Sequence, residues 1–271
     1  MHTGKLSEAK QTLEESLAAL KDVAVRIQVG TALVEIDYEL GRLDDALAAT
    51  NMLQTIAPND PDILYMTYRT HSAIASRALA KLARFDGDSA RLHEVLGESH
   101  ESENNFSAAI SEFKKALAIS PGLAGLHFEL GQALLRNEAN GNSPEAEHEF
   151  ELARAENPYD AHSEYELGEI SYARSDLKTA LEDYSKALEM QPDFAEAHIG
   201  LGEVLLDLGR VEEAIQHLRA AIRLDDENAT AHYRLARAYK SLNQVDDAER
   251  EMKTFERLKK SQSTNPSSGN Q

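Results

Sequence analysis

Histidines are the first residues in this chain that suggest chemistry, since it has ten of them and no cysteine. His93-Glu94 followed by His100 is superficially similar to the zinc-binding motif of metalloproteases. That motif needs two histidines four residues apart, so that both reach one zinc ion from the same face of a helix. A separation of seven residues is two helical turns, a rise of about 10 Å, which one metal ion does not span. The pattern therefore predicts no zinc site.

Four histidines recur at equivalent places in the chain: His93, His127, His198 and His232. If each lies on its own helix pair, neighbouring ones are about 10 Å apart, too far to share a metal ion. We therefore interpret them as partly buried packing residues. A second hypothesis is that their protonation near about pH 6 loosens the helix stack, which would lower the melting temperature between about pH 7.5 and pH 5.5.

Other motifs that could bind a ligand lack the required context. Asp86-Gly87-Asp88 has no later glutamate of a calcium-binding loop and is typical of a helix stop. Gly200-Leu201-Gly202 lies inside an expected helix, whereas a phosphate-binding glycine loop follows a strand. No nucleophile stands in a pattern that indicates an activating base. The sequence thus predicts a protein that is not an enzyme, with no catalytic residue, no metal site and no cofactor.

A 34-residue unit, most regular at 195–228, would position any functional residue. It predicts two amphipathic helices, 196–208 and 211–224, joined by a turn at Gly209. The small residues Gly202 and Ala214 indicate that the two helices cross closely. Further copies lie in register at 27–60, 90–123, 124–160, 161–194 and 229–262. The copy at 124–160 carries three extra residues in its turn, which we expect to project as a longer loop.

This unit resembles the tetratricopeptide repeat, a family of helical hairpins of the same length. The residues that carry the resemblance are His198, Leu201-Gly202, Leu205, Ala214, Leu218 and Ala221, with His198 where the family usually has tryptophan. The resemblance extends over six registered copies. It implies an all-α fold, an α-solenoid in which stacked hairpins form a right-handed superhelix.

The repeat divides the chain into segments, two of which allow alternatives. Residues 1–26 fit a half-repeat with Gly4 at its turn and Ala9 at the crossing, which indicates either a chain cut from a longer protein or a genuine start with a capping helix. Residues 61–89 are one long helix or a shortened repeat, and the lack of Gly, Pro and Asn from 62 to 86 favours the long helix. The expected segments are 1–26 (half-repeat or cap), 27–60, 61–89, 90–123, 124–160, 161–194, 195–228, 229–260 (C-terminal repeat or cap) and a disordered tail at 261–271.

Charge and composition restrict the possible partners. With 47 acidic and 28 basic residues, the chain has a net charge of −19 and would repel nucleic acids and anionic membranes. No apolar stretch approaches the roughly 20 residues needed to cross a bilayer, and the N-terminus lacks the apolar core of a signal peptide. We therefore expect no nucleic-acid binding, no membrane insertion and, by default, a cytoplasmic protein.

The resemblance also implies where a partner would bind, because the first helices of the family's repeats line the concave face of the solenoid. Transferring the family's inward-pointing positions gives the candidate binding residues Glu98, Phe128, Gln132, Leu135, Tyr165, Glu169, Tyr172, Ile199, Glu203, Leu206, Tyr233 and Arg237. The alternative is that the aromatic residues among them only cover the inner surface. Two specialised family sites, a lysine–asparagine clamp for C-terminal carboxylates and an asparagine ladder, are absent from the corresponding positions.

These features predict an adaptor that holds a peptide or helix from another protein by apolar anchors, with Glu98, Glu169 and Glu203 selecting basic side chains. The expected partner is a protein or peptide with apolar and basic side chains. A second hypothesis is a targeting or substrate-recruiting segment of a larger enzyme or secretion assembly. A third is self-association through the end repeats, and the sequence leaves the oligomeric state open.

Overall fold

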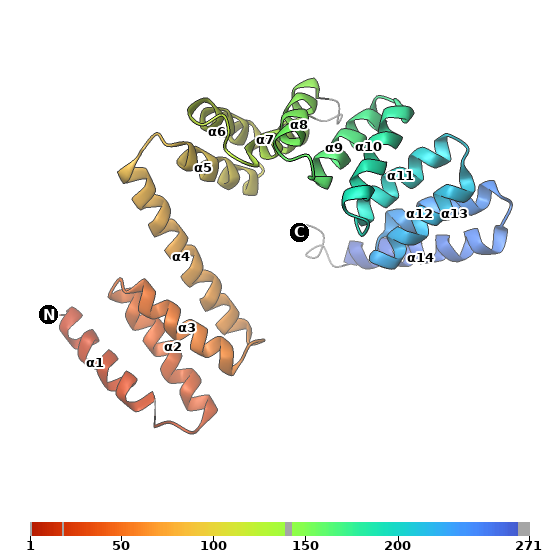
Figure 1. Ribbon diagram of the computed structural model, residues 1–271. Helices are drawn as coiled ribbons and strands as arrows, with labels where there is room; N and C mark the ends of the chain where they lie inside the picture. The colour runs from red at the N-terminus through yellow and green to blue at the C-terminus, as the bar shows by residue number, and fades with distance from the viewer. Residues whose placement is uncertain (1, 18, 139–142, 265–271) are drawn as a thin grey trace. The chain divides into compact units, whose positions relative to one another are not determined.

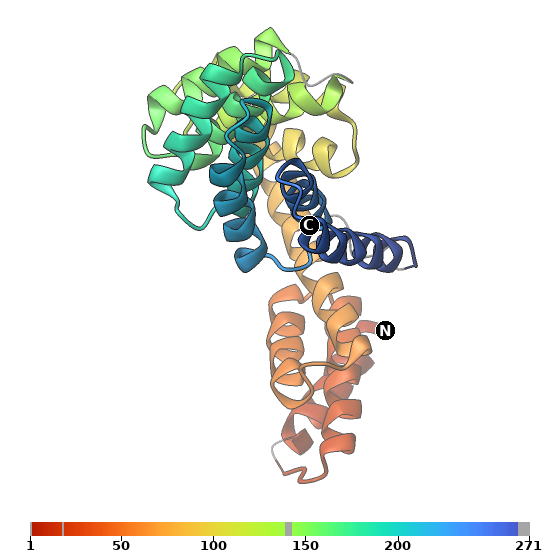
Figure 2. The ribbon, with the colours of Figure 1, turned by 90° about the vertical axis from the view of Figure 1, so that its right-hand side faces the viewer.

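The computed structural model describes residues 2–17, 19–138 and 143–264, and all regular structure in these ranges is helical. Its contacts divide the chain into two compact units, 1–92 and 93–271, which we describe separately. The first unit contains α1 (His2–Leu17), α2 (Val23–Glu39), α3 (Leu43–Ile56) and α4 (Pro61–Phe85), coloured red to orange in Figures 1 and 2. The second begins within α5 (Ala90–Ser102) and continues with α6 (Phe106–Ile119), α7 (Leu126–Asn137), α8 (Pro144–Glu156), α9 (Ala161–Ala173), α10 (Leu177–Met190), α11 (Ala195–Asp207), α12 (Val211–Leu224), α13 (Ala229–Ser241) and α14 (Val245–Thr264).

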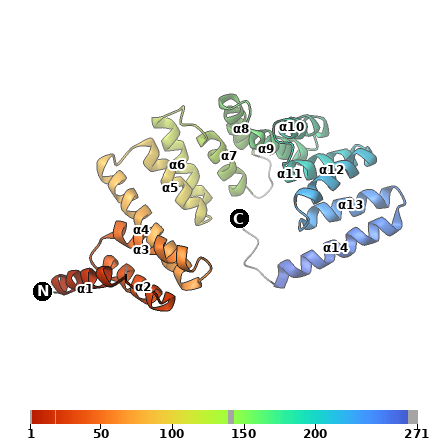
Figure 3. The same ribbon diagram turned by 60° about the horizontal axis from the view of Figure 1, so that its bottom comes forward.

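The second unit is a stack of helix hairpins. Helices α7 to α14 pack as consecutive pairs, and each hairpin contacts the next through its second helix, as α8 contacts α9 and α10 contacts α11. Figure 3 shows the hairpins following one another in chain order. This arrangement confirms the all-α solenoid fold that the repeat predicts.

Glycine permits the close crossing within each hairpin. A Cβ atom added to Gly202 would lie 2.7 Å from Cγ of Leu218 on the facing helix, and one added to Gly131 would lie 2.8 Å from the ring of Phe150. Both of these facing side chains are fully buried. The expectation that Gly202 is small because the helices cross closely is therefore confirmed.

Local chain chemistry sets where the helices begin and turn. Asp160 accepts hydrogen bonds from the backbone amides of His162 and Ser163, which stabilises the start of α9. Within the hairpins, the turn requires a left-handed backbone conformation, with φ of 76° at Gly209. Ser175 and Asn243, one repeat before and after, adopt it at φ of 61° and 56°.

In the first unit, α1 packs through a buried lysine. Gly4 lies inside α1 and Ala9 is exposed, so the expected turn and crossing are wrong at these two positions. The buried neighbour is Lys10, whose Nζ donates to Oδ1 of Asp37 on α2 at 2.6 Å and to Oδ2 of Asp45 on α3 at 2.5 Å. These ionic contacts, which the apolar repeat pattern does not encode, orient α1.

Residues 61–85 form the single helix α4, so the long-helix alternative describes this segment. Asp60 caps the helix and Pro61 occupies its first turn. One face, with Ile63, Met66 and Thr70, is buried, and Ile63 and Met66 share a core cluster with Val34 and Leu53. A second stripe is largely exposed, and we call it the α4 seam: Leu64, Tyr68, His71, Ala75, Ala78, Leu82 and Phe85.

The last helix extends further than the sequence suggests. α14 continues to Thr264, so residues 261–264, expected to be disordered, are helical. Polar side chains do not prevent the backbone hydrogen bonds of a helix from continuing beyond the hydrophobic core. The rest of that tail, 265–271, and the inserted residues 140–142 lie outside the described residues. No helix in the described ranges combines the length and apolarity needed to cross a membrane.

Candidate functional site

All twelve predicted binding residues lie on first helices of hairpins in the second unit. Among these helices, α11 contacts both α9 and α13 directly. The three helices therefore form one continuous surface, which we call the A-helix face. Glu98 on α5 and the predicted residues of α7 lie on the preceding hairpins.

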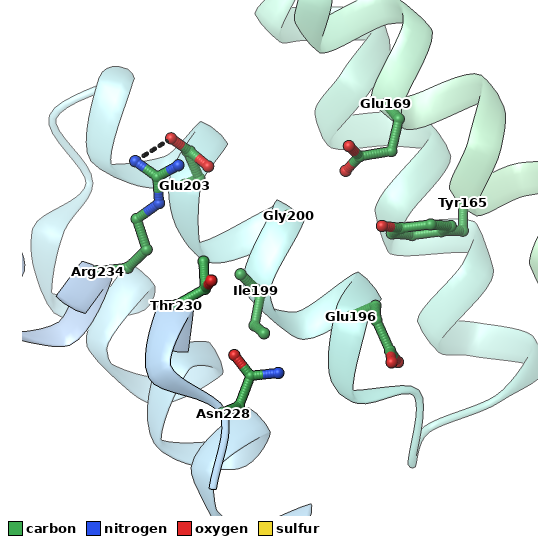
Figure 4. A pocket seen from close by; sticks show the side chains of 9 residues that line it. All are labelled: Tyr165, Glu169, Glu196, Ile199, Gly200, Glu203, Asn228, Thr230 and Arg234. Carbon is green, nitrogen blue, oxygen red and sulfur yellow. Dashed lines mark ion pairs between the residues drawn. The ribbon is translucent and has the colours of Figure 1, made fainter. Parts of the chain in front are cut away.

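A cavity of about 310 Å³ opens on the A-helix face. Figure 4 shows the labelled residues of α11 between those of α9 on one side and those at the start of α13 on the other. Its lining residues are Tyr165, Glu169, Glu196, Ile199, Gly200, Glu203, Asn228, Thr230 and Arg234. Four predicted residues, Tyr165, Glu169, Ile199 and Glu203, are thus brought together, and the other eight lie outside this cavity.

An ion pair crosses the cavity wall between Arg234 Nη1 and Glu203 Oε1 (Figure 4). Both side chains are largely buried, with 23% and 14% of their surfaces exposed. Glu203 therefore already has a cationic partner within the chain, and its expected role of selecting a partner's basic side chain stays a prediction. The signal for this pair in the sequence is the opposite charge of Glu203 on one first helix and Arg234 on the next.

The remaining carboxylates of the cavity differ in environment. Oε1 of Glu169 accepts a hydrogen bond from the Tyr184 hydroxyl at 2.5 Å, and burial raises the pKa of Glu169 above its ordinary value. Glu196 is exposed and, in the described part of the chain, forms no ion pair. Sequence reasoning missed Glu196, which lies in the first turn of α11. It is the carboxylate of the cavity most accessible to a partner.

The aromatic residues of the first helices pack inward as well as facing outward. The Phe128 ring lies 5.5 Å from Phe150, and the Tyr165 ring lies 5.0 Å from Phe194. Tyr233 retains 37% exposure. The alternative that these rings cover the inner surface is therefore partly supported for Phe128 and Tyr165, whose removal would disturb the core.

The other predicted residues have simpler surroundings. The Tyr172 hydroxyl donates to Oδ2 of Asp207 at 2.8 Å, which fixes the ring beside α11. The leucines among the predicted residues, Leu135 and Leu206, are half-buried, whereas the charged Glu98 and Arg237 are exposed. Gln132 is half-buried and donates from Nε2 to Oε1 of Glu166 at 3.4 Å.

Glu166 on α9 is a carboxylate that the structure makes hard to ionise. Burial raises its pKa to about 7, Gln132 opposes this shift, and the nearby Glu169 adds to it. The pKa of this carboxyl group is higher in the folded state than in the unfolded state. Its contribution to stability is therefore complete at pH values below the unfolded-state pKa, and it is lost as the pH rises towards 7. The ionised form therefore destabilises α9 at and above neutral pH.

We predict that Glu166→Gln raises the melting temperature at about pH 8 and has little effect at about pH 4.5, where the native side chain is already neutral. One pKa unit corresponds to about 1.4 kcal/mol, so a rise of the pKa from 4.5 to about 7 limits the gain at high pH to about 3.5 kcal/mol. Circular dichroism melting at both pH values measures it. Glu151→Gln on α8, where the side chain is exposed, is the control, and equal pH curves for the two variants would contradict the prediction.

The four repeated histidines each contact the second helix of their own hairpin. Three make Nδ1 contacts with carboxylates: His93 with Glu112 at 2.5 Å, His127 with Glu149 at 2.6 Å and His232 with Glu251 at 2.6 Å. Protonation there would create ion pairs, which opposes the hypothesis that acid loosens the stack. Of these four histidines, only His198 meets another histidine, with its Nδ1 3.0 Å from that of His217. Burial lowers the pKa of His217, and the charge of His198 makes a smaller contribution in the same direction. Within the described residues, no group of three or more His, Asp or Glu side chains is arranged to hold a metal ion.

Comparison with solved structures shows the same fold in several proteins. MamA from Desulfovibrio magneticus RS-1 is 19% identical with a TM-score of 0.57, and the match covers 64% of this chain and 96% of that one. YrrB, described as a TPR protein with an unusual peptide-binding site, is 22% identical with a TM-score of 0.54, covering 67% of this chain and 92% of that one. PilF from Pseudomonas aeruginosa is 19% identical with a TM-score of 0.55, covering 62% and 76%.

Family models give the relationship at the level of sequence, although no curated protein matches the chain. One tetratricopeptide repeat model matches residues 68–124, 138–189 and 165–229, and a second matches 205–256. The first model alone covers more than half of the 271 residues. With the stacked hairpins and their glycine crossings, these matches show that the chain belongs to the tetratricopeptide repeat family.

Proposed function

We propose that this chain is a non-catalytic protein-interaction scaffold whose A-helix face binds a peptide or helix from a partner protein. The observation that carries the proposal is the cavity between α9, α11 and α13, which combines the apolar Ile199 and the Tyr165 ring with carboxylates. The partner segment would insert an apolar side chain there and place a lysine or arginine beside Glu196.

Electrostatics favour a basic partner segment. The cavity contains three glutamates and one arginine, and that arginine is already paired with Glu203. A cation that approaches Glu169 would also stabilise its ionised form, which burial disfavours. The net charge of −19 would add long-range attraction and increase the association rate at low salt. The peptide-binding site named for YrrB supports the same class of partner.

A peptide-display library selected on the full chain tests the proposal. We expect the selected peptides to carry lysine or arginine next to apolar residues, and Glu196→Lys to weaken their binding about tenfold because it replaces attraction by repulsion. Glu189→Lys on α10 makes the same change at an exposed position outside the cavity and should leave binding almost unchanged. Selection of acidic peptides, or equal effects of the two variants, would contradict the proposed site.

A further inference from the structure

The α4 seam is a mainly apolar surface that the described residues of the first unit leave largely uncovered. Six of its seven residues are exposed and Leu82 is half-buried. The exposure reaches 70% at Tyr68 and 95% at Phe85. Large apolar side chains in a continuous exposed stripe are typical of an interaction surface.

The spacing of the seam specifies the kind of partner. Its residues alternate separations of four and three along all of α4, from Leu64 to Phe85. This is the heptad pattern in which one stripe of a helix stays in contact with a second helix over three repeats. A straight helix has 3.6 residues per turn, so a stripe that keeps an average of 3.5 is typical of a helix that packs along another helix.

The order of large and small side chains along the α4 seam suits pairing with the α4 helix of a second copy that runs antiparallel to it. Leu64 and Tyr68 are large apolar residues at one end, and Leu82 and Phe85 are large at the other. Between them lie His71 and the small residues Ala75 and Ala78. A two-fold axis near the alanines lets the helices approach closely at their crossing. It also places the large residues of each end against the opposite end of the other copy, as a self-complementary interface requires.

The distribution of charge in the first unit also supports antiparallel pairing of two α4 helices. Residues 22–60, which include α2 and α3, contain seven acidic and two basic residues, whereas residues 63–85 of α4 contain four basic and no acidic residues. Two of these cations already pair with that hairpin, Arg69 with Glu35 and Arg77 with Asp44. Lys81 and Arg84 make no ion pair in the described part of the chain, and antiparallel pairing places them near the acidic hairpin of the other copy.

From these observations we infer that the protein forms a homodimer through antiparallel pairing of the α4 seams of two copies. The interface is separate from the A-helix face and does not depend on the proposed peptide binding. Each dimer would then present two A-helix faces, so that a partner with two binding segments gains affinity through multivalency.

Light scattering of the full chain over a range of concentrations tests the dimer. We expect the mass to rise to twice 29.9 kDa with increasing concentration. The double substitution Leu82→Glu with Phe85→Glu should keep it at the monomer mass, with unchanged helical content by circular dichroism. Tyr159→Glu is the control, because Tyr159 is an aromatic residue in the second unit with 85% exposure. A monomer at every concentration, or a dimer that survives the double substitution, would overturn the inference.

Single cysteines test the direction of pairing, since the chain has none of its own. In the antiparallel dimer, the two copies of residue 64 lie more than about 30 Å apart at 1.5 Å per residue. With a short bismaleimide reagent, Leu64→Cys alone should therefore not crosslink, but it should crosslink when mixed with Phe85→Cys protein. Ala75→Cys should crosslink with itself, and Ala80→Cys, on the opposite face of α4, should react far less. Efficient crosslinking of Leu64→Cys with itself would refute the antiparallel arrangement.

Discussion

Replacing Lys10 with alanine should destabilise the first unit by about 3–5 kcal/mol, the cost typical of leaving a buried charge without its partner. The side chain of Asp37 is 2% exposed and that of Lys10 is 6% exposed. Burial raises the pKa of Asp37 against the opposing effect of Lys10. Burial also opposes the charge on Lys10, but its hydrogen bonds to Asp37 and Asp45 raise its pKa above the ordinary value. Hydrogen exchange of the α2 and α3 amides in the full chain measures the loss.

The double substitution Lys10→Met with Asp37→Leu separates the ion pair from the packing. Replacing both members of a buried pair with apolar residues of similar size is often neutral or stabilising, so most of the lost protection should return. Asp45 is about half exposed and can be solvated by water when Lys10 is absent. If the α2 and α3 amides of the Lys10→Ala variant are as well protected from hydrogen exchange as those of the native chain, the ion pair contributes nothing to holding α1.

The fold of the second unit was predictable because one physical requirement recurs every 34 residues. Each hairpin needs a small residue at its crossing and a large apolar residue facing it, and pairs such as Gly202 with Leu218 record this requirement directly in the sequence. The period then places the hairpins in register. It also predicts correctly which residues occupy the first helices, and therefore four of the residues that line the cavity.

Contacts between polar side chains were not predictable from the same pattern. Lys10 looks like a surface residue until Asp37 and Asp45, which lie 27 and 35 residues later, are placed around it. The Glu203–Arg234 pair depends on how far two first helices are rotated against each other, which apolar periodicity does not fix. The end of α14 was missed because helix propensity continues after burial ends.

Tyr184 connects the core of the second unit to the candidate site. Its side chain is fully buried on α10, between a glycine of α9 and a glycine of α11. A Cβ atom on Gly168 would lie 2.8 Å from the ring, and one on Gly200 would lie 2.6 Å from it. The hydroxyl reaches Glu169 in the cavity. Gly200 is thus required by packing, which explains the Gly-Leu-Gly sequence inside a helix without a phosphate site.

Tyr184→Ala should therefore cost the second unit about 3–5 kcal/mol, as expected for a large buried ring. Gly200→Ala should cost about 1–3 kcal/mol by overpacking against that ring. In the double variant the added methyl group meets no ring, so the Gly200→Ala cost should disappear and the two effects should be strongly coupled. Hydrogen exchange of the α9 and α11 amides measures all three variants.

Gly4→Ala in α1 is the matched control, since a Cβ atom there meets nothing within 4 Å. A glycine in an open helix position gains up to about 1 kcal/mol on conversion to alanine, so the same substitution has the opposite sign when no ring faces it. If Gly200→Ala is equally costly with and without Tyr184, the close approach of α11 to this ring does not determine the packing. The position of Glu169 in the cavity would then require another cause, because the Tyr184 hydroxyl reaches that carboxylate only while the ring lies between the two glycines.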